Sequence, residues 1–214
     1  MKIARFIFQL FGINTYVVWD PESKDCAVID PGMISPEEED ALDKFITKNS
    51  LKVKHLINTH LHIDHAAGNK FVTERYGIGS EANSNDQFLS KSFSQQSQMF
   101  NLPFEAEGVE ITNDLQDGDI VKIGNGELKV LQVPGHSPGS IALYDSKDKF
   151  LISGDALFEG SIGRTDLPGG SSRELIESIK TKILSLPDDT VVYPGHGDPT
   201  TVGSERKYNP FLRN

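Results

Sequence analysis

Short runs of apolar residues, separated by turn-forming residues, dominate the first half of the chain and predict strands. In one segment the apolar residues recur instead at helical spacing, just after Ser35-Pro36, a pair typical of a helix start. We therefore expect a helix over residues 36–48 with Ser35 as its N-cap. A second helix is expected over residues 66–76. The strands expected in this half comprise residues 3–8, 15–19, 25–30 and 53–58.

The second half returns to strand-like patterns after a polar segment. Residues 80–100 are rich in Ser, Gln and Asn, and we interpret them as a helix and loop over the surface, either a solvated connector or a lid beside the active site. A helical pattern covers residues 172–186. No linker divides the chain, so we expect a single domain, residues 1–214, of mixed α/β class. The strands expected here comprise residues 120–123, 128–133, 140–144, 150–153 and 191–193.

Composition and charge exclude several classes of protein. Acidic residues outnumber basic ones by 31 to 21, and the net charge of -10 argues against a nucleic-acid binder or a partner of anionic membrane surfaces. The single cysteine, Cys26, excludes an internal disulfide and a cysteine-based zinc cluster, and it favours a reducing cytoplasm. No apolar run is long enough to span a membrane, and Gln9 interrupts the N-terminal stretch that looks briefly like a signal peptide.

Five of the six histidines, together with two aspartates, follow predicted strands. Three histidines and one aspartate lie within residues 60–65, two more histidines lie in Pro-Gly-His triplets, and the second aspartate follows another strand. Because strand ends at one edge of an α/β sheet face a common crevice, we expect these side chains to converge. The set is His60, His62, Asp64, His65, His136, Asp155 and His196.

Imidazole and carboxylate together, without thiolate, predict a site for divalent metal ions. We expect zinc first, and iron or manganese also suit these donors. Seven ligands exceed one tetrahedral site, so we expect two adjacent ions, with Asp155 able to bridge them. A single histidine at a strand end is usually an ordinary hydrogen-bonded residue, and we assign no role to His55, which lies inside a strand. The four ionisable groups within residues 60–65 would instead repel one another without a cation.

Seven motifs occur along the chain in a fixed order: Asn14-Thr15-Tyr16, Asp30-Pro31-Gly32, Thr59-His60-Leu61-His62-Ile63-Asp64-His65, Pro134-Gly135-His136-Ser137-Pro138-Gly139, Gly154-Asp155-Ala156, Gly163-Arg164-Thr165-Asp166 and Tyr193-Pro194-Gly195-His196. In this order they resemble the metallo-β-lactamase superfamily, and within it the small glyoxalase II-like hydrolases. The resemblance implies a four-layer αββα sandwich with two mixed β-sheets, helices outside and the metals at one edge.

The resemblance also implies how the ligands divide between two ions. Asp155 would bridge the ions, and Asp30 would hydrogen-bond near the site from behind the ligands, unless it is a simple turn residue before Pro31-Gly32. The implied sets are His60, His62 and His136 for the first ion, and Asp64, His65 and His196 for the second.

The implied activity is hydrolysis of an acidic thioester such as S-D-lactoylglutathione, by attack of a hydroxide that bridges the two metals. Asp64 would orient this hydroxide in addition to binding a metal. Arg164 lies in a glycine-rich loop. We expect it either to hold a substrate carboxylate or to pair with Asp166 and brace the loop.

Two features depart from the long glyoxalase II proteins, and other functions stay open. Only 18 residues follow His196, so we expect no counterpart of the C-terminal helical domain that contacts glutathione there, and Gly197 stands in place of a tyrosine. The main alternative is a persulfide dioxygenase with one iron held by His60, His136 and Asp155. The Pro-Gly-His context of the last histidine favours the dinuclear hydrolase, since dioxygenases usually have Pro-Ala-His. A lactonase, a β-lactamase and a non-catalytic oxygen-binding module are the remaining alternatives.

Overall fold

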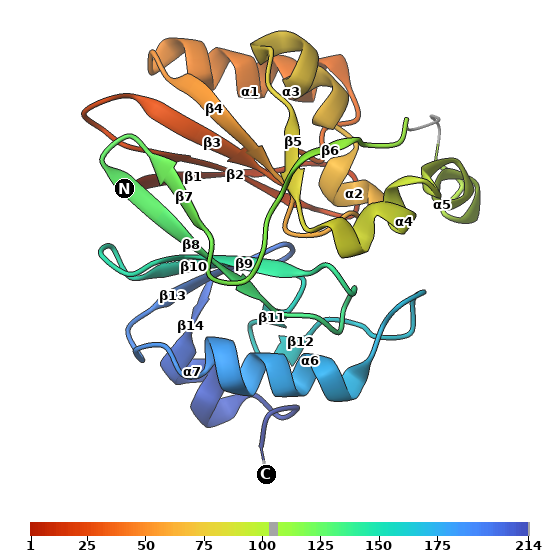
Figure 1. Ribbon diagram of the computed structural model, residues 1–214, viewed down its shortest axis with the longest axis vertical. Coiled ribbons are helices and arrows are strands. Elements are labelled where there is room, and N and C mark those ends of the chain that lie inside the picture. The colour runs from red at the N-terminus through yellow and green to blue at the C-terminus, as the bar shows by residue number, and fades with distance from the viewer. Residues whose placement is uncertain (103–106, 214) are drawn as a thin grey trace.

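Two six-stranded mixed sheets face each other at the centre of the molecule (Figure 1). The computed structural model describes residues 1–102 and 107–213. In the first sheet, the first three strands pair antiparallel and the remaining pairs are parallel. These strands, in spatial order, are β1 (Lys2–Ile7), β2 (Asn14–Trp19), β3 (Asp25–Ile29), β4 (Lys52–Ile57), β5 (Ser80–Ala82) and β6 (Ile111–Asp114).

The second sheet contains one parallel pair, β10 with β13, and its other pairs are antiparallel. Each strand expected from the apolar runs is confirmed, with ends that shift by two residues at most. A small hairpin of β11 (Leu157–Phe158) and β12 (Ser161–Ile162) follows β10. The sheet's strands, in spatial order, are β14 (Thr200–Thr201), β13 (Val191–Pro194), β10 (Phe150–Gly154), β9 (Ile141–Asp145), β8 (Gly126–Gln132) and β7 (Ile120–Ile123).

The main core lies between the two sheets. Tyr16, Ile29 and Ile57 from the first sheet belong to the same buried cluster as Val130 and Ile152 from the second. Burial of each such side chain favours folding by roughly 1.5–3 kcal/mol. This packing fixes how the strand ends of one sheet lie relative to those of the other.

Helices cover the outer face of each sheet and complete four layers (Figure 1). Leu42 and Val72 pack the first pair of helices on the first sheet, and Leu175 and Val202 pack the second group on the other. The αββα sandwich implied by the sequence motifs is therefore confirmed. None of the described helices combines the length and the apolarity that a membrane span requires. The layers are formed by α1 (Pro36–Lys48) and α3 (Asn69–Tyr76), and by α6 (Ser172–Ser178), a π-helical turn (Ile179–Ile183) and α7 (Val202–Tyr208).

The helix α1 begins and ends as predicted, whereas two other helices differ. Ser35 caps α1 by accepting the Glu38 N–H at 3.4 Å. The helix expected over residues 66–76 is instead two helices, α2 (Ile63–Ala66) and α3, with a break at Gly68. The Gly68 N–H donates to the Pro31 carbonyl at 2.8 Å, and a Cβ at Gly68 would approach that oxygen to 2.9 Å. The helix expected over residues 172–186 changes to π geometry after α6.

The polar segment at residues 80–100 contains a strand that its pattern does not predict. The strand β5 has only three residues, yet it is buried and pairs in parallel with both neighbours. Phe93 is buried against Leu61 and Ile63, in the segment that carries the clustered histidines. The segment is therefore more than a solvated connector. Its helices are the 3₁₀ turn η1 (Ser84–Asp86), α4 (Gln87–Ser90) and α5 (Phe93–Met99).

Candidate metal centre

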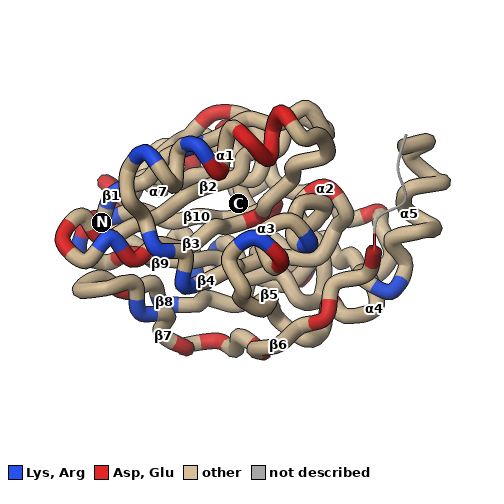
Figure 2. The backbone as a smooth tube through the Cα atoms, turned by 90° about the horizontal axis from the view of Figure 1, so that it is seen from above, with Lys and Arg blue, Asp and Glu red and all other residues tan. Residues whose placement is uncertain are grey.

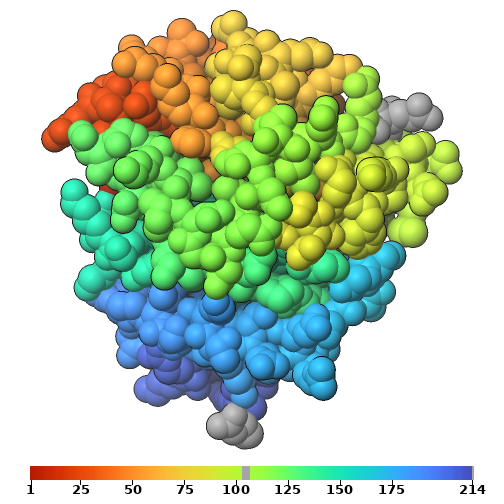
Figure 3. All heavy atoms as spheres, in the orientation of Figure 1, coloured from red at the N-terminus to blue at the C-terminus, as the bar shows by residue number. Residues whose placement is uncertain are grey.

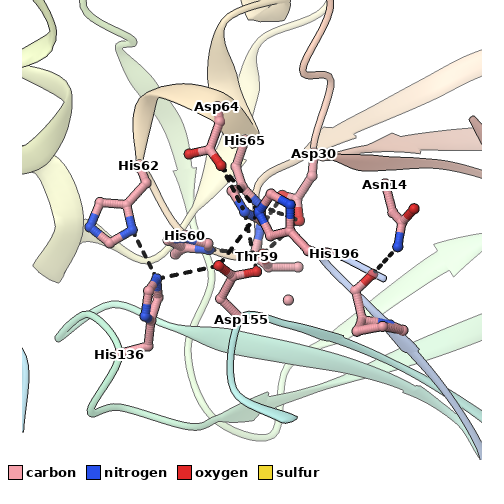
Figure 4. Close-up of polar contacts among 12 residues, drawn as sticks. Asn14, Asp30, Thr59, His60, His62, Asp64, His65, His136, Asp155 and His196 are labelled. Carbon is pink, nitrogen blue, oxygen red and sulfur yellow. Dashed lines mark hydrogen bonds and ion pairs between the residues drawn. The ribbon is translucent and has the colours of Figure 1, made fainter. Parts of the chain in front are cut away.

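The seven predicted metal ligands meet at one edge of the sandwich, where strands of both sheets end (Figure 4). His55, by contrast, lies inside β4 and pairs with Glu81. Because the strand ends are fixed by the core between the sheets, the ligands are held by rigid elements on both sides. The first sheet supplies His60, His62, Asp64 and His65, which follow β4, and the second supplies His136, Asp155 and His196, which follow β8, β10 and β13.

The ligands form three overlapping groups of three, and the group of His60, His65 and Asp155 connects the other two, which share no residue. Within each group the ligand atoms lie within 4.8 Å of one another. Asp155 Oδ1 lies 3.3 Å from His65 Nε2, and Asp155 Oδ2 lies 3.6 Å from His136 Nε2. One carboxylate therefore faces both groups. The two groups that share no residue are His60, His62 and His136, and Asp64, His65 and His196.

Hydrogen bonds to the outward nitrogens orient three of the rings. In each case Nδ1 faces a carboxylate or carbonyl oxygen, which only accepts, so Nδ1 carries the proton. Each Nε2 therefore turns its lone pair toward the centre, as a metal ligand requires. The pairs are His65 with Asp30 at 3.0 Å, His136 with the Arg164 carbonyl at 2.7 Å, and His196 with the Phe11 carbonyl at 3.1 Å.

Asp30 lies behind the ligands, fully buried, and holds them from the first sheet. It accepts the Thr59 N–H at 2.7 Å and the Thr59 hydroxyl at 2.6 Å, in addition to its contact with His65. Thr59 Oγ1 in turn lies 3.2 Å from Nδ1 of His60. The backbone φ of Asp30 is 51°, in the left-handed region that costs energy for a residue with a Cβ. Asp30 therefore positions Thr59 and His65 through hydrogen bonds, which a simple turn residue would not do.

Four buried polar atoms of the cluster have no hydrogen-bond partner, which tests whether metal ions fit. They are Nε2 of His60, His62 and His65, and Oδ1 of Asp155. Each buried polar atom left unsatisfied costs about 1–3 kcal/mol. Nδ1 of His62 also faces Nε2 of His136 at 2.9 Å, a hydrogen bond when His62 carries its proton on Nδ1 and a pair of metal-ligand atoms when it does not. Divalent cations would satisfy Nε2 of His60 and His65 and Oδ1 of Asp155, and zinc, iron and manganese all suit these atoms.

Electrostatics keep the donors available to a cation. Burial and the neighbouring His65 ring hold the pKa of His60 well below its usual range, and burial lowers the pKa of His62 to about 4. Burial alone would raise the pKa of Asp155, but the rings of His65 and His136 outweigh it and hold that pKa low. The carboxylates outweigh burial at His65 and raise its pKa. A metal ion would therefore compete with a proton for Nε2 of His65.

Close packing requires glycine in both Pro-Gly-His triplets. Gly135 has a φ of 131°, and a Cβ there would lie 2.2 Å from the backbone nitrogen of Leu175. A Cβ on Gly195 would lie 2.2 Å from Asp155 Oδ1 and 2.6 Å from Cε1 of His65. The second triplet thus lets its strand end approach the bridging carboxylate closely.

A pocket of about 310 Å³ opens over the cluster. Its walls include Phe11, from the loop between β1 and β2, and Gln96 and Phe100 from α5 and its end. The rings of Phe11 and Phe100 meet edge to face, with centroids 5.3 Å apart. Sequence reasoning missed these three residues, because single aromatic or amide residues in a loop and a short helix form no motif.

Arg164 adopts the second of its two expected arrangements. Its guanidinium makes two hydrogen bonds of 2.7 Å to the Asp166 carboxylate, while the side chain also lines the pocket. Its backbone carbonyl orients His136. The main chain of this loop therefore positions the His136 ring, independently of what the Arg164 side chain binds.

A buried carboxylate that the sequence did not single out connects two ligand loops. Asp86, in η1, accepts the Leu61 N–H at 3.1 Å and the Ser137 hydroxyl at 2.6 Å with one oxygen. Its other oxygen accepts the Gly139 N–H at 2.6 Å. Leu61 lies between two ligands of the first sheet, and Ser137 follows a ligand of the second. No motif marks Asp86, because its partners are backbone groups and a serine distant in sequence.

Comparisons with known proteins converge on one family. Residues 9–196 match the sequence profile of the Metallo-beta-lactamase superfamily. The chain is 39% identical to hydroxyacylglutathione hydrolase GloC of Haemophilus influenzae, over 99% of this chain and 98% of that protein. Its fold is similar to BLEG-1 B3 metallo-beta-lactamase, with a TM-score of 0.90, 32% identity and full coverage of both chains. It is also similar to TTHA1623 in a di-iron-bound form, with a TM-score of 0.86 and 32% identity over 98% of this chain and 100% of the other.

Proposed function

Because the chain belongs to the metallo-beta-lactamase superfamily, we propose that it is a dinuclear metallohydrolase that cleaves thioesters such as S-D-lactoylglutathione. The observation that carries this proposal is the position of Asp155 between two groups of three ligands, beneath an open pocket. The similarity to a hydroxyacylglutathione hydrolase supports the thioester class.

The proposed reaction divides its tasks between bound metal and the chain. Two bound divalent ions would supply a water of lowered pKa and a Lewis acid for the substrate carbonyl. Asp64 lines the pocket, with Oδ2 3.1 Å from His196 Nε2, so its carboxylate is placed to accept a hydrogen bond from the attacking water and fix its direction. A thiolate leaves readily without a proton donor, so the pocket needs no general acid.

The main alternative, a persulfide dioxygenase, would use one iron and only three of the seven ligands. The second group would then stay without an ion, although Asp64 and His196 converge to 3.1 Å and His65 Nε2 is buried without a partner. The similarity to TTHA1623, described in a di-iron-bound form, also supports two ions and keeps iron beside zinc as a candidate. We therefore favour the dinuclear hydrolase.

The proposed substrate is an acidic thioester, and Arg164 is its proposed carboxylate contact. Among the described residues that line the pocket, Arg164 carries the sole lysine or arginine side chain. Its bidentate pair with Asp166 has the geometry that a substrate carboxylate would take over. A reducing cytoplasm is the compartment we propose, since the single cysteine, Cys26, allows no internal disulfide.

Metal analysis of the purified protein, combined with a substrate panel, tests this proposal. We expect two metal ions per chain and release of free thiol from S-D-lactoylglutathione. A lactone, a β-lactam and glutathione persulfide are the comparison substrates, the last followed by oxygen uptake. One iron per chain, with persulfide-dependent oxygen uptake and no thioester cleavage, would establish the alternative instead.

A further inference from the structure

An apolar groove lies beside the metal centre, between the helices α4 and α5 and the loop at residues 167–168. Its cavity volume is about 240 Å³. In Figure 3 the yellow to yellow-green segment that carries the two helices lies above the light-blue segment near residue 165, on one face of the molecule. We use the name apolar groove for this surface, whose apolar lining is Phe88, Leu89, Met99, Phe100, Leu167 and Pro168. The uncharged polar residues Ser92, Gln95 and Gln96, together with His62, complete the lining.

Charged side chains are absent from the described lining of the apolar groove. No lysine, arginine, aspartate or glutamate contributes to it, and α5 is uncharged over its whole length, as Figure 2 shows. Phe88 and Met99 nevertheless remain exposed, by 43% and 69%. Large apolar side chains exposed around a cavity are typical of a binding site for an apolar group.

The apolar groove is continuous with the pocket over the metal ligands. His62, Gln96, Phe100 and Leu167 line both cavities. Because His62 is itself a predicted metal ligand, a group in the groove would be attached directly to a carbonyl held at the metal centre. Neither Arg164 nor Asp64 lines the groove, so it is distinct from the charged side of the pocket.

Hydrogen bonds fix the wall of the groove relative to the metal ligands. The side-chain oxygen of Gln96 accepts the Ile63 N–H at 3.1 Å, next to His62. The amide nitrogen of Gln96 donates to the Leu89 carbonyl at 2.9 Å. Gln96 therefore joins α5 to both α2 and α4, and the buried Phe93 anchors the same helix. A site held in this way is preformed, which lowers the cost of binding.

We propose that the apolar groove binds the acyl chain of the substrate, so that the enzyme prefers thioesters of apolar acyl groups. This inference rests on the proposed thioester hydrolysis and names the acyl class. The acyl half fits better than the thiol half, because carriers such as glutathione bear charges that would lose their hydration in the groove. An apolar acyl chain has no charged group whose hydration would be lost. In this arrangement the charged thiol carrier lies on the Arg164 side of the pocket.

An acyl series on one uncharged thiol carrier tests the proposal. We use the acetyl, butyryl and hexanoyl thioesters of N-acetylcysteamine with the metal-loaded protein. Each buried methylene adds up to about fourfold to binding, and a groove that is partly open to solvent gives less. We therefore expect kcat/KM for the hexanoyl thioester to exceed that for the acetyl thioester at least about tenfold, mainly through KM.

The variants Phe88→Gln and Met99→Gln locate the effect in the groove. Both side chains are exposed, so these changes leave the core intact. We expect the ratio of hexanoyl to acetyl kcat/KM to fall below about threefold in the double variant, because the methylenes then lose apolar contact. The matched control is Ile120→Gln, an apolar residue 45% exposed on β7 that lines neither cavity and should leave the ratio unchanged.

The possible outcomes separate the two proposals. If kcat/KM is the same for the acetyl and hexanoyl thioesters, the acyl groove is wrong while the proposed thioester hydrolysis is still supported. The same conclusion follows if the ratio of hexanoyl to acetyl kcat/KM is unchanged in the double variant. Acetyl thioesters of ethanethiol, butanethiol and hexanethiol are assayed in parallel, and a length preference in this thiol series instead of the acyl series also overturns the acyl assignment. No cleavage of any thioester by fully metal-loaded protein overturns the proposed function, and the acyl groove with it.

Discussion

His62 is the ligand whose replacement tests the metal assignment most directly. Its Nδ1 faces His136 at 2.9 Å, and the first group has only His60 beside these two. We expect His62→Ala to lose about half of the bound metal and to lower hydrolysis at least about a hundredfold, because two rings cannot close a three-ligand site. The control His55→Ala removes a histidine outside the cluster. Full metal content in His62→Ala, measured by elemental analysis, would contradict the assignment.

Asp86 acts on the site through the loops that it joins. Asp86→Ala leaves the Leu61 and Gly139 N–H groups and the Ser137 hydroxyl without their acceptor. We expect a loss of about 3 kcal/mol in the free energy of unfolding and a weakening of metal affinity by about 10–100-fold. Denaturant unfolding and metal titration measure the two effects.

The control for Asp86 is another carboxylate that accepts backbone N–H groups, at a site distant from the metal centre. Asp20 accepts N–H groups of Glu22, Ser23 and Asn125. We expect Asp20→Ala to lower stability without changing metal affinity. An equal loss of metal affinity in both variants would show that Asp86 acts only through overall stability.

Asp166 holds the Arg164 side chain and thereby controls its reach. The pair is exposed on both sides, so it contributes little to stability. We expect Asp166→Asn to lower KM for acidic thioesters about twofold or more, because the guanidinium loses its charged partner, and to leave KM for neutral thioesters unchanged. Steady-state kinetics on one acidic and one neutral thioester check this. Equal changes for both substrates would favour a purely bracing role for Arg164.

Between elements, His55 links the two sheets from a position inside β4. Its Nδ1 lies 2.6 Å from Glu81 Oε1 on β5, and its Nε2 lies 3.0 Å from the Lys122 carbonyl on β7. Both partners accept, so the doubly protonated ring satisfies both contacts. The hydrogen bond to Glu81 raises the pKa of His55 above its usual value.

This raised pKa fixes the sign of a pH effect on stability. The contribution of His55 is fully present below the pKa of the unfolded state, about 6.5, and is lost as pH rises through the folded-state pKa. We expect wild type to exceed His55→Gln in unfolding free energy by at most about 1 kcal/mol near pH 6, since the pair is partly solvated, and by less near pH 9. Urea unfolding of both proteins at both pH values measures this. A difference that stays constant with pH would exclude the charged pair.

At the level of elements, the sequence predicts what depends on local pattern. The strands β3 and β4 and the helix α1 follow from apolar runs and from the cap at Ser35. The strand β5 escapes prediction, because the three residues Ser80–Ala82 carry no apolar alternation and are strand only through their two neighbours. The break at Gly68 escapes for a similar reason, since it depends on contact with Pro31, which is distant in sequence.

In the candidate site, too, some residues can be predicted from local sequence pattern and others cannot. The seven ligands stand out because histidine and aspartate recur in tight motifs at strand ends, and the structure brings all seven together. Phe11, Asp86 and Gln96 do not stand out, because each acts through contacts with residues far along the chain. Local spacing therefore predicts the donors, while the groups that hold them and shape the pocket emerge only when the two sheets are packed.

For the molecule as a whole, the metal centre is a junction between the two sheets. Four ligands come from the first sheet and three from the second, and Asp155 faces both groups. Ions bound there would therefore connect the two halves of the sandwich, in addition to the apolar core between them. Metal loading would then be coupled to the stability of the described chain.

We expect removal of both metals by a chelator to lower the melting temperature by about 10–20 °C, twice the effect of a single ion. An ion that binds only the folded state adds about 2.7 kcal/mol when its concentration is a hundred times its Kd, and 1 kcal/mol shifts the melting temperature of a domain of this size by roughly 2–4 °C. Scanning calorimetry with and without chelator, and after zinc is restored, measures the shift. The variant His62→Ala should show a smaller shift, because it holds less metal to lose. Equal melting temperatures with and without metal in wild type would mean that the ions do not join the sheets. The buried nitrogens of His60 and His65 that have no hydrogen-bond partner would then need another explanation.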